Sequence, residues 1–176
     1  MDEIEIKVIN EDYSQIRKKL ISLGAKKISF GHLHTYYLDT PDLKFAREKK
    51  VLRLRFGADK SYAMLGYKST KEDSNISVYD EKEVKVENPK VALEIFLSSG
   101  FIIADELEKT REKYVFENSE IVFDKLLGKY SFVPEYLEIE SKSKIELNKL
   151  VEKLGISKTN LKPINSHELI ALYSKK

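Results

Sequence analysis

The chain of 176 residues contains no cysteine, which excludes disulfide bonds, thiolate metal ligands and cysteine nucleophiles. It also lacks any apolar run approaching the ~18 residues that a membrane-spanning helix requires. Its first residues, MDEIEIK, are acidic and do not have the composition of a signal peptide. We therefore expect a cytoplasmic protein without a membrane partner.

An excess of either charge is missing as well. The sequence holds 31 basic and 29 acidic residues, so its net charge is only +2, and no broad basic surface for nucleic acid is expected. No linker or repeat interrupts the chain, and its length suits one domain over 1–176. Any anion binding must come from local segregation of charge. Formation of a homodimer stays open.

The apolar pattern predicts a mainly antiparallel sheet with short helices. Strands are expected near 3–8, 27–38, 51–56, 61–69, 76–87, 101–117, 120–127 and 134–142, and helices near 12–24, 89–100, 144–154 and 166–173. In the helix at 89–100, Val91, Ile95 and Phe96 should form the buried side. Because eight strands are enough to close a barrel, we predict an α+β fold in which an eight-stranded antiparallel closed β-barrel has a polar lumen and peripheral helices.

Several strands pair an apolar face with a face made only of charge. In EIEIK, Glu3, Glu5 and Lys7 alternate with isoleucines. A single strand of this kind is ordinarily half-buried with a solvated face. Here like charges recur two residues apart, as in Glu3/Glu5 and Arg53/Arg55, and side chains at that spacing lie ~6.5–7 Å apart and repel. Each such pair therefore needs something that neutralises it.

A barrel with its charged faces turned inward supplies that neutralisation. The acidic set is Glu3, Glu5, Glu81, Glu83, Asp124, Glu138 and Glu140, and the basic set is Lys7, Arg53, Arg55, Lys68, Lys85, Lys109 and Arg111. Charges removed from water are tolerated when they are paired or bound to a ligand. Arginine and lysine suit phosphate oxygens, and carboxylates suit Mg²⁺ or Mn²⁺. The residue types thus predict a site for a phosphate chain and a divalent metal ion.

The order of these motifs resembles the CYTH superfamily, also called triphosphate tunnel metalloenzymes. The matching stretches are EIEIK (3–7), HTYYLD (34–39), LRLR (52–55), YK (67–68), EKE (81–83), EKTREKY (108–114), FDKL (123–126), YLEIE (136–140) and SHELI (166–170). That superfamily includes class IV adenylyl cyclases, thiamine triphosphatases and inorganic triphosphatases. The resemblance implies an antiparallel tunnel of eight strands, with metal on Glu3, Glu5 and a late-strand glutamate and triphosphate on the arginines and lysines.

We therefore predict a metal-dependent enzyme that acts on a small-molecule triphosphate. The predicted metal ligands are Glu3, Glu5, Glu83, Asp124, Glu138 and Glu140. The predicted triphosphate-binding residues are Lys7, Arg53, Arg55, Lys68, Lys85, Lys109 and Arg111. Lys7, Arg53 and Arg55 are the predicted catalytic residues, with Lys7 as a phosphate clamp rather than a nucleophile, because neighbouring carboxylates favour its charged form.

The first choice of reaction is that of a class IV adenylyl cyclase, which converts ATP to cAMP and pyrophosphate. The alternatives are hydrolysis of tripolyphosphate, thiamine triphosphate or a nucleoside triphosphate, a non-catalytic triphosphate-binding module, and a purely structural barrel. His32, His34 and His167 are expected at the surface or the tunnel rim rather than as metal ligands or bases. The basic segment 44–50 is expected to be a solvated connection, with a lid as the alternative.

Overall fold

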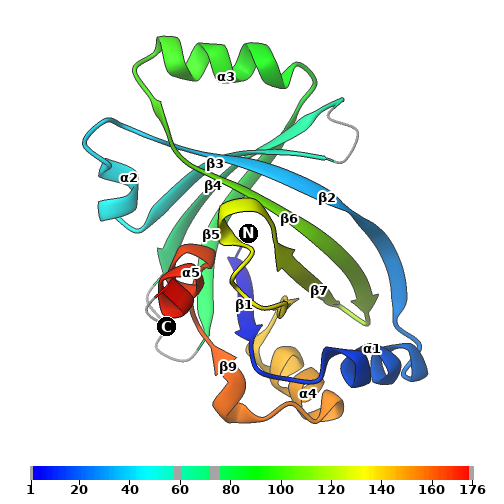
Figure 1. Ribbon diagram of the computed structural model, residues 1–176. Helices are drawn as coiled ribbons and strands as arrows, with labels where there is room; N and C mark the ends of the chain where they lie inside the picture. Colours follow the sequence, from blue (N-terminus) through cyan, green and yellow to red (C-terminus); the bar gives the residue numbers. More distant parts are fainter. Residues whose placement is uncertain (1, 58–60, 72–75, 175–176) are drawn as a thin grey trace.

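The computed structural model describes residues 2–57, 61–71 and 76–174. For residues 2 and 3 it describes the backbone alone. A single strongly curved sheet carries helices on its outer side (Figure 1). The strands are β1 (Asp2–Val8), β2 (Lys26–Asp39), β3 (Lys50–Phe56), β4 (Ala63–Lys71), β5 (Ser77–Val86), β6 (Ile102–Phe116), β7 (Ser119–Leu126), β8 (Tyr136–Ser141) and β9 (Leu161–Lys162). The helices are α1 (Tyr13–Ser22), α2 (Lys44–Arg47), α3 (Pro89–Ser98), α4 (Lys144–Leu154) and α5 (Ser166–Ser174), with 3₁₀ turns at Gly128–Tyr130 and Lys158–Asn160.

The sheet closes on itself. Its order is β5-β4-β3-β2-β6-β7-β8-β1, and β1 also pairs with β5, so eight strands form a ring. The closing register places Ile4 opposite Val78 and Glu5 opposite Ser77. All these pairs are antiparallel. The predicted eight-stranded barrel is confirmed, and the short strand β9 beside β1 is an addition that the sequence pattern did not predict.

Local side chains define where the helices begin. Asp12 accepts a hydrogen bond from the Gln15 backbone N–H at 3.1 Å, which confirms it as the N-cap of α1. Pro89 occupies the first turn of α3, where its missing N–H costs nothing. Helix α4 starts at Ser143, which accepts from the Glu146 N–H, and it ends at Gly155 in the left-handed conformation.

The main core lies outside the ring, between the sheet and two helices. Ile6, Phe123 and Ile139, on the outer faces of β1, β7 and β8, pack with Leu20 of α1 and Leu150 of α4. Every one of these side chains is at most 3% exposed. The apolar strand faces therefore point outward under helices, which leaves the charged faces to the interior.

Helix α3 lies on the opposite side of the molecule from α1 and α4 (Figure 1) and packs less deeply. It covers a small cluster around Leu54, Phe56 and Ala63. The prediction that Val91 and Ile95 are buried is wrong, because these side chains are 45% and 60% exposed. Leu93 faces the sheet instead, so Val91 and Ile95, two residues before and after it, turn towards the surface.

One end of the lumen is apolar and is closed by α5. Leu107, Leu126 and Tyr136, which share the inner strand faces with the charged residues, pack with Leu169 and Ile170 of α5.

The basic segment 44–50 contains α2 and the first residue of β3. Its start is tied to the end of β2, because the buried Asp39 carboxylate accepts the N–H groups of Phe45 and Ala46, both at 2.9 Å. None of the described helices has both the length and the apolar character needed to cross a bilayer.

Candidate active site

The inner strand faces enclose a cavity of about 400 Å³ to which all eight strands of the ring contribute. Among the predicted site residues, those that line it are Glu5, Lys7, Arg53, Arg55, Lys68, Glu83, Lys109, Arg111, Glu138 and Glu140. Glu81, part of the predicted acidic set, lines it as well. The acidic and basic rows thus share one interior, as the charge pattern predicts.

Three predicted site residues are not among those that line this cavity. Asp124 is fully buried behind it and accepts hydrogen bonds from Lys109 Nζ at 2.5 Å and from Arg111 Nε at 2.7 Å. Lys85 is exposed, and its Nζ lies 4.7 Å from the ring centre of Tyr62. The backbone of Glu3 pairs with that of Tyr79, but its side chain lies outside the described residues.

Lys7 lies at the centre of the deepest charge cluster and is 2% exposed. Its Nζ is 2.7 Å from Glu138 Oε1 and 3.2 Å from Glu5 Oε1. Burial disfavours the charged ammonium, but the two carboxylates outweigh it and raise the pKa of Lys7 well above its ordinary value. Lys7 is therefore a fixed cation and not a neutral amine that could act as a nucleophile or base.

A row of three carboxylates crosses β1, β8 and β7. Glu5 lies directly opposite Glu140, and Glu140 lies directly opposite Glu120. Opposed side chains on neighbouring strands are ~4.5–5.5 Å apart at Cβ, and like charges there repel. Burial works against ionisation of Glu5, but Lys7 and Lys68 outweigh it and lower its pKa. This row can hold a hard divalent cation, which takes oxygen ligands.

Glu120 also contributes to the cavity, although the sequence analysis did not propose it. It has the same parity along β7 as Asp124, so strand alternation alone indicated that it faces inward. It forms an ion pair with Lys113, another cavity residue that was not proposed.

The opposite wall carries the arginines of β3. Arg53 donates to Glu81 at 2.8 Å and to Glu83 at 3.1 Å, and Arg55 donates to Glu83 at 2.9 Å. β4 lies between β3 and β5, and its Gly66 leaves room for the Arg53 and Glu83 side chains to meet above it. A Cβ at position 66 would lie 3.1 Å from Glu83 Oε1 and 3.2 Å from Arg53 Nε. Among the described residues, the buried Nε of Arg53 has no hydrogen-bond acceptor.

Lys109 and Arg111 of β6 complete the cation set. Arg111 Nη2 lies 2.7 Å from Glu138 Oε2 and 2.6 Å from Asp124 Oδ2. For Lys109, burial and the adjacent Arg111 outweigh the attraction of Asp124 and lower the pKa to about 8.

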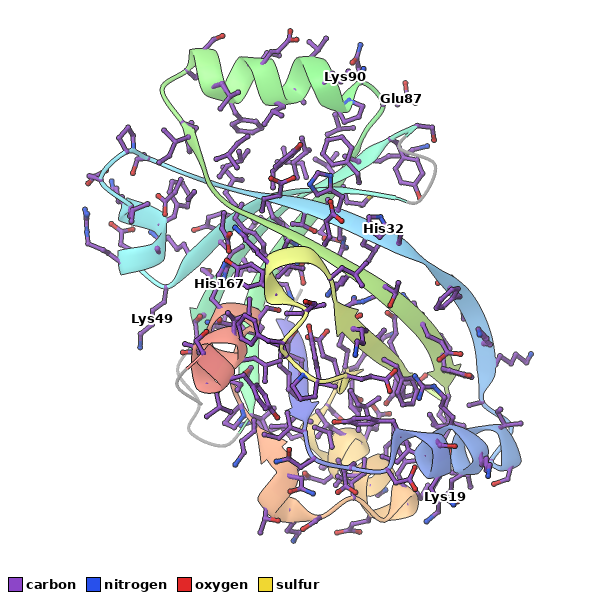
Figure 2. All side chains as sticks on the ribbon, viewed as in Figure 1. Lys19, His32, Lys49, Glu87, Lys90 and His167 are labelled. Carbon is purple, nitrogen blue, oxygen red and sulfur yellow. The ribbon has the colours of Figure 1, made fainter. Side chains whose placement is uncertain are left out.

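The start of α5 reaches the cavity through Asn165, Ser166 and His167. His167 Nε2 is 3.1 Å from Asp105 Oδ2, and its ring lies 4.6 Å from that of Tyr37. His167 lines the cavity and its side chain is 42% exposed, which agrees with the expectation that it lies at the surface or at the rim of the tunnel. Figure 2 shows it at the start of α5, whereas His32 lies on β2, away from this end.

Comparisons with known proteins agree with this geometry. A family model described as CYTH domain matches residues 1–164. The protein named "Putative adenylate cyclase MJ0240" from Methanocaldococcus jannaschii is 30% identical over 166 residues, which cover 92% of this chain and 94% of that protein. The solved structure of the PH1012 protein from Pyrococcus horikoshii OT3 is similar with a TM-score of 0.79 at 23% identity, covering 95% of this chain and 98% of that one.

A plant protein has the same fold. The structure reported as "Putative adenylyl cyclase HpAC1 from Hippeastrum reveals a dominant triphophatase activity" aligns with a TM-score of 0.71 at 17% identity, covering 97% of this chain and 95% of that one.

Proposed function

Because the chain belongs to the CYTH domain family, we propose that it is a metal-dependent enzyme that binds a triphosphate in the charged cavity of its barrel. The observation that carries this proposal is the facing of carboxylates and cations across one enclosed space. A triphosphate with a divalent metal ion presents negative oxygens to the cations and a positive centre to the carboxylates. Such a ligand matches both walls at once.

The proposed metal site is built on Glu5 and Glu140, with Glu138 and Glu120 beside them. Carboxylate oxygens fit Mg²⁺ or Mn²⁺, and a cation between Glu5 and Glu140 would relieve the repulsion between opposed like charges. When bound, the metal ion supplies charge neutralisation at the phosphoryl oxygens. Asp124 is proposed to position Lys109 and Arg111 instead, since these cations already bind both of its oxygens.

The cations are proposed to bind the phosphate chain by exchanging partners. Arg53, Arg55 and Lys68 now contact Glu81, Glu83 and Glu5, at distances of 2.8–3.2 Å. These contacts hold the guanidinium and ammonium groups in place before a ligand arrives. Charge that develops on the phosphate oxygens in the transition state would then meet donors that are already oriented. The free N–H of Arg53 Nε offers one further donor.

The first proposed reaction is ATP cyclisation, in line with the name of the relative from Methanocaldococcus jannaschii. In that reaction the ribose 3′-oxygen attacks the α-phosphorus, its proton leaves, and pyrophosphate departs. Lys7, Arg53 and Arg55 would stabilise the charge on the departing phosphates. Burial lowers the pKa of Lys7, but Glu138 and Glu5 outweigh it and favour the protonated ammonium.

Hydrolysis of the terminal phosphate is the second candidate, and the lining of the cavity favours it. Among the described lining residues, the only side chains that are aliphatic or aromatic, apart from the His167 ring, are Val51, Tyr37 and Tyr79. The rest are charged or polar, which suits a phosphate chain better than a purine base. Water would attack the terminal phosphorus and orthophosphate would be released.

One assay separates these reactions. ATP, tripolyphosphate and thiamine triphosphate are each incubated with Mg²⁺ or Mn²⁺, and cAMP, pyrophosphate and orthophosphate are measured. Equal yields of cAMP and pyrophosphate from ATP support the cyclase, whereas orthophosphate without cAMP supports the hydrolase and removes the cyclase. Tight binding without turnover in either metal would leave a binding module. Absence of thermal stabilisation by tripolyphosphate would contradict the proposed site itself.

Cytoplasmic location, a triphosphate as the small-molecule partner and formation of a homodimer remain predictions. They follow from the composition and from the family resemblance. Gel filtration at two protein concentrations tests the last of them.

A further inference from the structure

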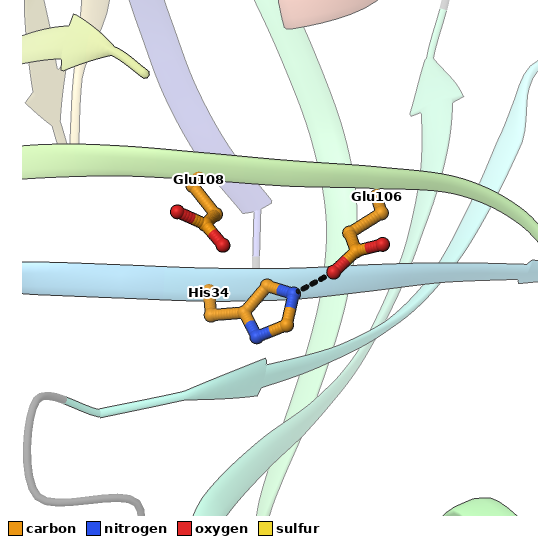
Figure 3. Close-up of side chains that lie close together, drawn as sticks. All are labelled: His34, Glu106 and Glu108. Atoms are coloured by element: carbon orange, nitrogen blue, oxygen red, sulfur yellow. Dashed lines mark hydrogen bonds and ion pairs between the residues drawn. The ribbon is translucent and has the colours of Figure 1, made fainter. Parts of the chain in front are cut away.

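A second group of chemically distinctive side chains lies on the outside of the barrel. His32 and His34 of β2 and Glu106 and Glu108 of β6 meet across the two neighbouring strands. His34 Nε2 is 2.5 Å from Glu106 Oε1, and His32 Nε2 is 3.3 Å from Glu108 Oε2. Figure 3 shows His34 between the two glutamates. One ligand atom each from His34, Glu106 and Glu108 lies within 4.8 Å of the others.

This cluster is separate from the cavity. Glu106 and Glu108 alternate along β6 with Leu107 and Lys109, which point to the interior. None of the four cluster residues lines the cavity. A ligand on the cluster would therefore bind on the outer side of the wall that holds Lys109 and Arg111.

The two glutamates lack the neutralisation that other carboxylates of this strand receive. Glu112, on the same outer face of β6, forms ion pairs with Arg17 and Lys27. Within the described parts of the chain, the ion-pair partners of Glu106 and Glu108 are the two histidines. Unlike the guanidinium and ammonium groups beside Glu112, an imidazole is charged only when protonated, so these two carboxylates, two residues apart, have no arginine or lysine partner among the described residues. A bound cation would supply that neutralisation.

We propose that His34, Glu106 and Glu108 bind a divalent first-row transition-metal ion such as Zn²⁺, with His32 as a fourth ligand. Imidazole nitrogen combined with carboxylate oxygen favours Zn²⁺, Ni²⁺ or Cu²⁺ over Mg²⁺, which prefers oxygen ligands alone. The outer site thus differs in chemistry from the oxygen-only carboxylate row inside the barrel.

The geometry allows the ligands to close on one ion. With bonds of about 2.0–2.2 Å, tetrahedral ligand atoms lie about 3.4 Å apart, so ligand atoms that now lie within 4.8 Å of one another must approach by up to about 1.4 Å. The glutamate side chains are 49% and 45% exposed and can move, whereas His34 is 13% exposed and packs against the rings of Tyr36 and Phe56. His34 is therefore the ligand that stays in place, and the two glutamate side chains are the ligands that move towards the ion.

Binding there would tie β2 to β6, the two longest strands of the ring. Because an ion that binds only the folded state stabilises it by mass action, Zn²⁺ should raise the melting temperature of the protein even when Mg²⁺ is already present in excess.

The test uses the untagged full chain with Mg²⁺ in excess and one equivalent of Cu²⁺ as the probe. Electron paramagnetic resonance is expected to show nitrogen hyperfine coupling from imidazole. The coupling should disappear in the His32→Ala/His34→Ala double variant and persist in His167→Ala, a control that removes the histidine at the cavity. If the double variant keeps the coupling, or if His167→Ala loses it, the proposed site is wrong.

A second measurement guards against misfolding of the variant. Zn²⁺ affinity from calorimetry should fall on the order of 100-fold in the Glu106→Gln/Glu108→Gln double variant, since even indirect support of a metal ligand is worth 10–100-fold. Thermal stability without Zn²⁺ and affinity for tripolyphosphate should stay within about twofold of the parent. Unchanged Zn²⁺ affinity in a folded double variant would overturn the proposal, whatever reaction the cavity performs.

Discussion

The two halves of the barrel wall are built differently. Outside β1, β7 and β8, helices α1 and α4 bury a continuous core that includes Ile6, Ile121 and Leu150. Outside β3, β4 and β5, helix α3 covers only a small cluster, and Val84 of β5 remains 57% exposed. The half of the ring made by β1, β7 and β8, which we call the clamped half, is packed tightly under helices. The half made by β3, β4 and β5 is only lightly covered.

Part of the inner faces follows the same division, although Glu120 of β7 is 44% exposed and Glu81 of β5 is 13% exposed. On the clamped half, the side chains of Lys7 and Glu138 are 2% and 6% exposed. On the lightly covered half, those of Arg53, Arg55 and Glu83 are 17%, 19% and 26% exposed. The proposed metal-binding carboxylates thus belong to the stiff wall, and the arginines that would grip phosphate belong to the wall with more freedom. In this arrangement the carboxylates would hold the metal ion in a fixed position, while the arginines could adjust to the phosphate oxygens of a ligand that enters as a metal complex.

The largest effect is expected from breaking the metal site on the stiff wall. Glu5→Gln keeps the shape of the side chain but removes its charge, and turnover with Mg²⁺ or Mn²⁺ should fall on the order of 100-fold or more. The assay is release of pyrophosphate or orthophosphate from a triphosphate. Glu94→Gln, on the exposed face of α3, is the matched control and should keep full activity. Full activity of a folded Glu5→Gln variant would show that the metal site is elsewhere.

A pair of core substitutions tests the difference in packing directly. Leu150→Ala should lower the free energy of unfolding by about 2–5 kcal/mol, because Leu150 is 3% exposed in the core under α4. Ile95→Ala should lower it by less than about 1 kcal/mol, since this side chain is 60% exposed on α3. Urea denaturation followed by circular dichroism measures both. Equal losses would contradict the distinction between the halves.

Gly66→Ala sharpens the comparison on the adaptable wall. The new methyl group would press on the ion pair between Arg53 and Glu83. We expect KM for the triphosphate to rise about tenfold through the displaced arginine, with a smaller change in kcat. If the guanidinium simply moves aside, KM will not change, and Arg53 is then not needed in its observed position.

The smallest effect is a pH dependence of binding. The pKa of Lys109 is lowered from 10.5 to about 8 by burial and by Arg111, so raising the pH through 8 removes one cation from the unliganded cavity. Affinity for tripolyphosphate should fall a few-fold between about pH 7 and pH 9.

Stability should respond with the opposite sign. The unfolded chain keeps the Lys109 proton up to its ordinary pKa, so this group makes the folded state more stable as the pH rises from about 8 to 10. If affinity for tripolyphosphate falls at high pH, deprotonation of Lys109 therefore does not cause that loss by unfolding the protein. In Lys109→Arg, whose guanidinium stays charged, the pH step in affinity should vanish.

Strand alternation predicted most of the charges that share the interior, but not all: Lys85 has the same parity as Glu81 and Glu83 and is nevertheless exposed. Residues two apart on a strand share a face, and the apolar residues that alternate with them lie on the outer face. This rule places three pairs on the inner face: Arg53 and Arg55, Lys109 and Arg111, and Glu138 and Glu140. Closure of the ring followed from the number of strands and the balance of charge. The site residues therefore came together although no single motif required it.

Cross-strand register was beyond the reach of the sequence pattern. Nothing local indicates that Glu140 lies between Glu5 and Glu120, or that His34 meets Glu106. Register depends on tertiary pairing between strands that are tens of residues apart. For the same reason, the orientation of α3 and the need for a glycine at position 66 became visible only in three dimensions.

The pairing of β1 with both β8 and β5 also sets an order of assembly. The ribosome makes β1 before its partner β8, which begins at Tyr136, and at about 5–20 residues per second the interval between them is roughly 6–30 s. Until β8 has been made, β1 cannot form this pair. Closure of the ring between β1 and β8 thus joins segments far apart in the sequence, and such long-range pairing is expected to slow folding.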